Sequence, residues 1–84
     1  MTARTPEEDL YIKQLCARVQ RLRKAKGRDW TQQVMAEFLG VDLARYQKYE
    51  IRSPLPHYLI EKFSIVTDSS IEYIITGRGQ RSQK

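Results

Sequence analysis

Apolar residues recur along the chain at the three- and four-residue spacing of helices, in stretches separated by short polar connections. The first stretch opens with a helix-start signature, in which Thr5 is the N-cap, Pro6 the first helical residue and Glu8 the third. This helix should run to about Ala25 or Lys26. Its inward stripe is Ile12, Leu15, Cys16, Val19 and Leu22.

Two shorter helices are expected on either side of Gly40. Thr31 should cap the first of them and Asp42 the second, because both side chains can accept a hydrogen bond from a backbone N–H at a helix start. The second of these helices should end after Glu50. Pro54 then prevents the preceding residue from continuing a helix.

Two further helices are expected after Pro54. Pro56 should be the first residue of the fourth, while Ser69 and Glu72 form a capping box that opens the fifth and Gly77 ends it. The inward positions of the fourth helix are Leu59, Ile60, Phe63 and Val66. Five helices without a strand predict an all-α fold.

The length of 84 residues indicates one domain with a small core. We expect a flexible start over residues 1–9, a folded domain over residues 10–77 and a flexible basic tail over residues 78–84. No internal repeat is visible.

The segment from Gln32 to Glu50 predicts a helix-turn-helix, the unit that places its second helix in the major groove of DNA. Ala36 is small where the two helices would cross, and Gly40 suits the turn. Val41, Tyr46 and Tyr49 should form the buried stripe of the second helix. Its outward face would then carry Leu43, Ala44, Gln47 and Lys48.

The net charge of +5 and the pI near 9.6 point to an anionic partner or to a solvated basic surface. Seven basic residues and no acidic one lie between Lys13 and Arg28. Both explanations of this run stay open. Arg21 and Lys24, for example, could face DNA or face away from it.

Several function classes are disfavoured by composition. One cysteine and one histidine offer neither a disulfide framework nor a zinc set, and no residue pair supplies a nucleophile with a base. No apolar run approaches the roughly 20 residues that span a bilayer, and no signal peptide opens the chain. We expect a cytoplasmic protein, associated with the nucleoid through DNA, that is not an enzyme and has no cofactor, metal or evident small-molecule effector.

From Arg18 to Gly77 the sequence resembles the Cro/repressor-type (XRE-like) helix-turn-helix family. The resemblance lies in the order and spacing of several short pieces. These pieces are Arg23 with Gly27, Trp30-Thr31-Gln32, Ala36-Glu37-Phe38-Leu39-Gly40-Val41, Tyr49-Glu50, Pro56 and Tyr73-Ile74-Ile75-Thr76-Gly77.

This resemblance implies a compact five-helix bundle of the lambda-repressor-like type that binds a near-palindromic operator as a homodimer. It implies that Gln32 touches a phosphate and that Arg23 and Glu50 form a partly buried ion pair. It also assigns base reading to the outward face of the third helix, the residues Leu43, Ala44, Gln47 and Lys48.

The sequence departs from the family pattern at a few positions. Arg52 replaces a common glycine after the third helix, which puts the loop conformation in question, and Arg28-Asp29 resembles a small insertion. Tyr46 stands where Ile or Val is usual, so it requires a roomier core or a phenol edge at the surface. Asp42 replaces the usual Ser or Thr cap.

Side-chain chemistry suggests roles for the exposed residues. Gln47 can pair with adenine and Lys48 with guanine, while Leu43 and Ala44 can pack on a thymine methyl; the alternative is a plain solvated face. Phosphate contacts are expected from Gln32, Arg45 and Arg52, with ordinary surface charge as the alternative for both arginines.

The C-terminal third carries more apolar residues than a small core needs. The surplus is a candidate dimer contact. It consists of Ile71, Tyr73, Ile74 and Ile75. Cys16 is expected to be buried and inert, and His57 to be a surface residue or a contact to a partner or the DNA backbone.

The function favoured by these observations is that of a sequence-specific double-stranded DNA-binding regulator, a phage or prophage repressor or a Cro-like protein. A homodimer would place two recognition helices about 34 Å apart on an inverted repeat. The alternatives are a restriction-modification controller protein and an antitoxin that mainly holds a protein partner.

Overall fold

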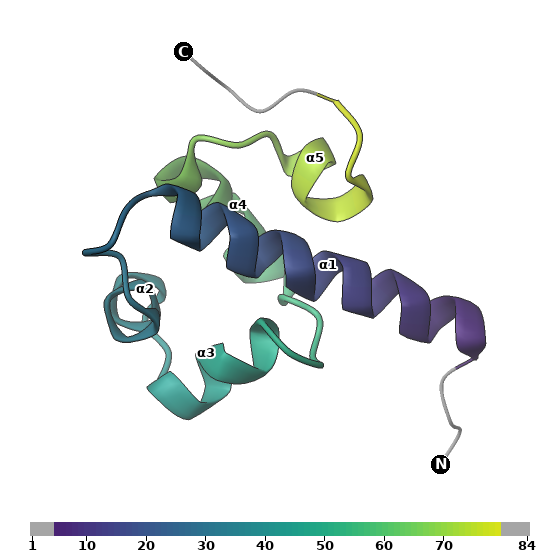
Figure 1. The fold of residues 1–84 in the computed structure, drawn as a ribbon, viewed down its shortest axis with the longest axis horizontal. Helices are drawn as coiled ribbons and strands as arrows, with labels where there is room; N and C mark the ends of the chain where they lie inside the picture. The colour runs from purple at the N-terminus through teal and green to yellow at the C-terminus, as the bar shows by residue number, and fades with distance from the viewer. Residues whose placement is uncertain (1–4, 80–84) are drawn as a thin grey trace.

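The computed structural model describes residues 5–79, and within this range it contains five helices and no strand. Figure 1 shows α2 and α3 on one side of α1 and α5 on the other, and the start of α1 extends beyond the remaining helices. The expected all-α class is confirmed for this range. The helices are α1 (Pro6–Ala25), α2 (Gln32–Leu39), α3 (Leu43–Tyr49), α4 (His57–Thr67) and α5 (Ile71–Thr76).

Helix α1 begins with a complete capping box. The hydroxyl of Thr5 accepts from the backbone N–H of Glu8 at 3.1 Å, and the Glu8 carboxylate accepts from the backbone N–H of Thr5 at 2.9 Å. Residues 6–9, which the expected division of the chain assigns to a flexible start, belong to this helix. Residues 1–4, and residues 80–84 of the expected tail, lie outside the described range.

The starts of α4 and α5 are displaced by one residue from the expected positions. Pro56 is the N-cap of α4, which begins at His57, because its backbone is extended (ψ 147°). Ser70, not Ser69, caps α5, since its hydroxyl accepts from the backbone N–H of Tyr73 at 3.0 Å. The expected capping box between Ser69 and Glu72 is therefore wrong.

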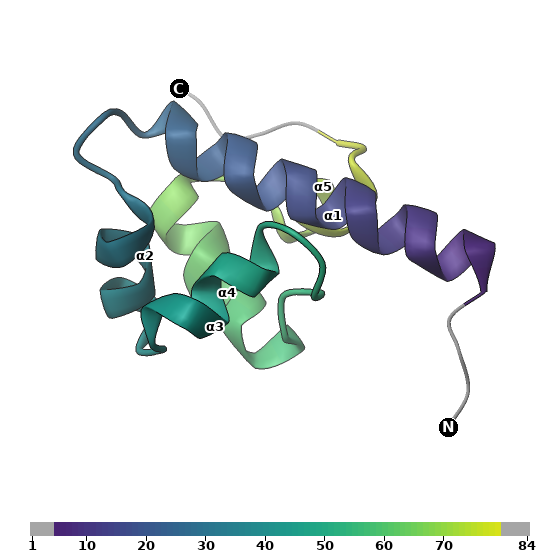
Figure 2. The ribbon, with the colours of Figure 1, turned by 60° about the horizontal axis from the view of Figure 1, so that its bottom comes forward.

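The core lies where the inner faces of the five helices meet (Figure 2). Its buried apolar members are Leu15, Val19, Leu22, Met35, Ala36, Leu39, Tyr46, Tyr49, Leu55, Leu59, Phe63 and Ile74. Ile12, Ile60 and Val66 of the expected stripes are only half-buried. Cys16 is buried as expected, and its thiol donates to the backbone carbonyl of Ser53 at 3.3 Å.

Arg18 joins α1 to α5 from within the protein. Its Nε donates to the carbonyl of Ile74 at 2.9 Å, and its Nη2 donates to the carbonyl of Ile75 at 2.8 Å. Carbonyls at a helix C-terminus lack partners within the helix and carry partial negative charge, so a cation stabilises them. Arg18, one of the seven basic residues between Lys13 and Arg28, thus stabilises the packing of α5 against α1.

None of the helices within residues 5–79 combines the length and the apolar character needed to cross a membrane.

Candidate nucleic-acid interface

Helices α2 and α3 are joined by three residues, Gly40 to Asp42. Gly40 adopts a left-handed conformation (φ 78°), and the backbone N–H of Val41 donates to the carbonyl of Ala36 at 3.0 Å, which closes the end of α2. Asp42 caps α3 by accepting from the backbone N–H of Arg45 at 3.2 Å. The start of α3 is thereby fixed against α2.

The helix α3 buries one face and exposes the other. Tyr46 and Tyr49 are buried, whereas Val41, expected in the same stripe, is half-buried. Four residues were expected on the outward face, and the structure brings them together on this short helix. Ala44 and Lys48 are exposed there, and Leu43 and Gln47 are half-buried.

Arg23 and Glu50 form the ion pair that the family resemblance implies. The guanidinium donates from Nε to Oε2 at 2.6 Å and from Nη2 to Oε1 at 3.2 Å. Its Nη1 donates to the carbonyl of Trp30 at 2.9 Å. The Glu50 side chain is 0% exposed and the Arg23 side chain 10% exposed, so a largely buried pair ties α1 to the end of α3.

Tyr46 resolves one departure from the family pattern. Its side chain is fully buried, and its hydroxyl donates to Oε2 of Glu50 in a short hydrogen bond. The phenol edge does not reach the surface. The ion pair instead supplies the acceptor that a buried hydroxyl needs.

The charges of this group are set by its surroundings. Burial raises the pKa of Glu50, but hydrogen bonds from Arg23, Tyr46 and Gln32 lower it more, so the net pKa lies below its usual value. Burial, together with the adjacent Glu50 carboxylate, holds the pKa of Tyr46 far above its usual value. The hydrogen bond to Glu50 raises the pKa of Arg23. At neutral pH the group therefore holds a cation, a carboxylate and a neutral phenol.

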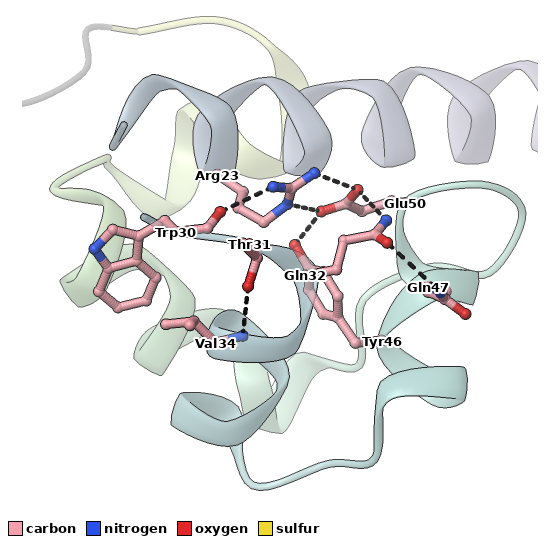
Figure 3. A network of polar contacts seen from close by, with 8 residues as sticks. All are labelled: Arg23, Trp30, Thr31, Gln32, Val34, Tyr46, Gln47 and Glu50. Carbon is pink, nitrogen blue, oxygen red and sulfur yellow. Dashed lines mark hydrogen bonds and ion pairs between the residues drawn. The ribbon is translucent and has the colours of Figure 1, made fainter. Parts of the chain in front are cut away.

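Gln32 connects this buried group to the outward face of α3 (Figure 3). Its Nε2 donates to Oε1 of Glu50 at 2.9 Å, and its Oε1 accepts from Nε2 of Gln47 at 3.3 Å. The expected phosphate contact of Gln32 stays a prediction. Its amide, however, is already bonded at both ends.

The two arginines that were expected to clamp phosphate lie apart from this network. Arg45 is exposed on α3, and Arg52 is exposed in the turn that follows. That turn closes on one carbonyl, since the backbone N–H groups of Arg52 and Ser53 both donate to Lys48, at 2.9 and 2.8 Å. Arg52 does not adopt a positive φ, so the turn does not need the glycine that is common in the family.

A basic depression of about 450 Å³ lies beside the start of α2. No acidic residue lines it, and the ammonium of Lys26 lies over the ring of Trp30, a lining residue, 4.6 Å from the ring centre. Arg28, part of the apparent insertion, contributes to the basic lining. The lining residues are Arg23, Lys24, Gly27, Arg28, Trp30, Thr31 and Gln32.

The candidate dimer residues of α5 do not share one environment. Ile71 is 45% exposed, and Tyr73 and Ile75 are half-buried. Ile74 is 0% exposed in the core, so including it in a dimer contact was wrong. His57 is exposed and stacks edge-on against Tyr58.

Sequence reasoning missed Arg18, the hydroxyl of Tyr46 and the bridging role of Gln32. A signal for Tyr46 was present, because it lies four residues before Glu50 and so shares a helix face with it.

No group of three potential metal-ligating side chains occurs within residues 5–79. No protein-family model, curated protein or solved structure matches the chain. The family resemblance therefore remains an expectation that depends on the motifs of the sequence.

Proposed function

We propose that this chain is a sequence-specific double-stranded DNA-binding transcriptional regulator, a phage or prophage repressor or a Cro-like protein, that binds an inverted-repeat operator as a homodimer. The observation that supports the proposal is the α2–α3 unit, two short helices joined by a three-residue turn. Its second helix, α3, exposes Ala44 and Lys48, and its Gln47 donates a hydrogen bond to Gln32 at the start of α2. A short helix with this outward face fits the major groove.

The proposed mechanism separates base contacts from phosphate contacts. Gln47 and Lys48 read base edges, and Leu43 and Ala44 pack on thymine methyl groups. Arg45, Arg52 and the basic depression beside Gln32 contact the flanking phosphates. Regulation follows because an occupied operator excludes polymerase.

The same features fit a restriction-modification controller protein, which would also bind an inverted repeat. An antitoxin-like role is supported by a different observation. Tyr58 is 64% and Ile65 is 69% exposed, and their seven-residue spacing places them on one face of α4. This face could hold a protein partner.

The first test is affinity selection of the protein on random duplex DNA at about 150 mM salt. An enriched inverted repeat with half-sites about 10–11 bp apart would support a dimeric operator-binding regulator. Retention without an enriched sequence would contradict it and favour the protein-partner role.

Two variants then distinguish base contacts from phosphate contacts at the proposed interface. Lys48→Ala should weaken binding to the selected site by about 1–3 kcal/mol and leave binding to random DNA unchanged, whereas Arg45→Ala should weaken binding to both. Equal losses of Lys48→Ala on the two kinds of DNA would refute its base-reading role.

A further inference from the structure

The carboxylate of Glu50 accepts four hydrogen bonds in a site closed to water. Oε2 accepts from Nε of Arg23 and from the hydroxyl of Tyr46, while Oε1 accepts from Nη2 of Arg23 and from Nε2 of Gln32. An ionised carboxylate has about four acceptor positions and no donor. Every position is therefore occupied, and with its side chain 0% exposed, the group has no alternative partner in solvent.

This saturation fixes the orientation of two side-chain amides. A glutamine amide has nearly the same shape in either orientation, but only its NH₂ group can donate to a carboxylate. Gln32 must therefore direct Nε2 towards Glu50, which leaves its Oε1 directed towards Gln47. Gln47 must in turn donate through its own Nε2.

The consequence reaches the outward face of α3. One N–H of the Gln47 amide is used by Gln32, so the second N–H and Oε1 remain for a ligand, and the positions of donor and acceptor cannot be exchanged. Adenine presents an acceptor, N7, beside a donor, the N6 amino group, in the major groove. Because the Gln47 amide is held in one orientation, its N–H can face N7 and its Oε1 can face the N6 amino group in one alignment only.

We propose that Glu50 is a positioning residue for sequence recognition: through Gln32 it sets the donor–acceptor order that Gln47 presents to the bases, so that adenine is selected at one defined position of each half-site. Glu50 itself does not touch DNA. Arg23 donates to both oxygens of the carboxylate and Tyr46 donates to Oε2, and together they hold the carboxylate in place. This inference rests on the proposed function of the α2–α3 unit.

The connection can be cut at Gln32 while the ion pair is left in place. Gln32→Met keeps the length of the side chain and removes both hydrogen bonds. Gln32→Asn is a second variant, because its amide is one methylene shorter and cannot span Glu50 and Gln47 together. Gln33→Met is the matched control, since Gln33 is the next residue of α2, is exposed, and bonds Glu37 on the surface at 2.9 Å.

The measurement is a set of dissociation constants on duplexes in which each operator position carries each of the four base pairs in turn. Gln47→Ala identifies the position that Gln47 reads. There the parent should prefer adenine by about tenfold or more, and both Gln32 variants should lower this preference to below about threefold. Preferences at other positions should stay within about twofold of the parent, and Gln33→Met should match the parent throughout.

Other outcomes overturn the inference in distinguishable ways. If both Gln32 variants keep the parent's preference at the Gln47 position, Glu50 does not act on recognition through Gln32. If the variants lose preference equally at every position, the residue supports the fold alone. If Gln47→Ala changes no preference, this inference fails while the proposed function stands. A parent protein without any base preference overturns both.

Discussion

Two buried arginines of α1 differ in the partners that they bind. Arg18 and Arg23 are each 8% exposed, lie five residues apart and reach the C-terminal end of another helix. Arg18 donates to neutral carbonyls of α5, on the side of α1 away from α2 and α3 (Figure 1). Arg23 donates to the Glu50 carboxylate. Gln32 also donates to that carboxylate and accepts from Gln47 of the candidate interface.

The comparison shows that residue type and burial do not by themselves reveal a role. Removing the Glu50 carboxylate would leave the buried guanidinium of Arg23 without its ionic partner. Removing Arg18 would leave only neutral carbonyls at the end of α5 without their donor. The two sites therefore differ in energy and in their hydrogen-bonded connection to the candidate interface, and each difference can be tested.

The largest effect is expected from Glu50→Ala. The variant leaves the Arg23 guanidinium without its carboxylate and should lower the free energy of unfolding by about 3–5 kcal/mol. Thermal unfolding followed by circular dichroism measures this. The control is Glu61→Ala, because Glu61 is exposed on α4. A Glu50→Ala protein that melts within about a degree of the parent would show that the ion pair contributes nothing.

Arg18→Met should have a smaller and more local effect. It removes two hydrogen bonds from a cation to carbonyls and should cost about 1.5–3 kcal/mol. Hydrogen exchange should show faster exchange in α5, while α2 and α3 keep the parent's protection. Arg21→Met is the control, since Arg21 is exposed on the same helix. Unchanged protection of α5 would contradict the role assigned to Arg18.

Gly77 and Gly40 offer a matched pair, because both have φ 78°. Replacing either by alanine should cost about 1 kcal/mol for the left-handed backbone. At Gly77 the added Cβ would lie 2.8 Å from Nη1 of Arg18, whereas at Gly40 no such atom lies within 4 Å. Gly77→Ala should therefore cost about 1 kcal/mol more, since Arg18 must move from its hydrogen bonds.

This excess should vanish when Arg18 is already methionine, as measured by urea unfolding of the double variant. Equal costs at the two glycines in the parent background would show that Arg18 can move aside without losing its hydrogen bonds to α5.

The smallest effect at neutral pH is expected from Tyr46→Phe, about 1.5 kcal/mol, because it removes one hydrogen bond to the Glu50 carboxylate. The pKa of Tyr46 is raised in the folded protein by burial and by Glu50, against 10.0 in the unfolded chain. Its contribution is therefore complete below pH 10 and is lost as pH rises further, because only the unfolded state releases the proton. Tyr46→Phe should lack this part of the alkaline decline.

The pH profile of unfolding, measured from pH 8 to about pH 11, separates the two proteins. Tyr11→Phe is the control, since Tyr11 is exposed on α1. Parallel alkaline slopes for the parent and Tyr46→Phe would refute a neutral, buried Tyr46.

The order of helices could be predicted because caps and turn residues act locally. Thr5, Thr31 and Asp42 cap where expected. At α5 two adjacent serines could each cap, and the pattern with Glu72 favoured the wrong one. Local signals therefore identify a helix start, but tertiary packing chooses between neighbouring candidates.

The candidate site was predicted in part. The outward face of α3 followed from helical spacing, and the Arg23–Glu50 pair from the family resemblance. The hydrogen bonds of Gln32 could not be foreseen, since they require α2, the end of α3 and Gln47 to meet in space. Arg18 carried a readable signal, because it lies three residues after Leu15 and four before Leu22, both buried.

Cys16 makes the turn after α3 observable in solution. Its thiol is 2% exposed and donates to the carbonyl of Ser53, and it is the one cysteine of the chain. A thiol-alkylating reagent can react there only when the protein opens around Cys16, either because the segment after α3 lifts from α1 or because the whole domain unfolds. An alkylation rate faster than global unfolding therefore reports how often the turn after α3 opens, without an added label.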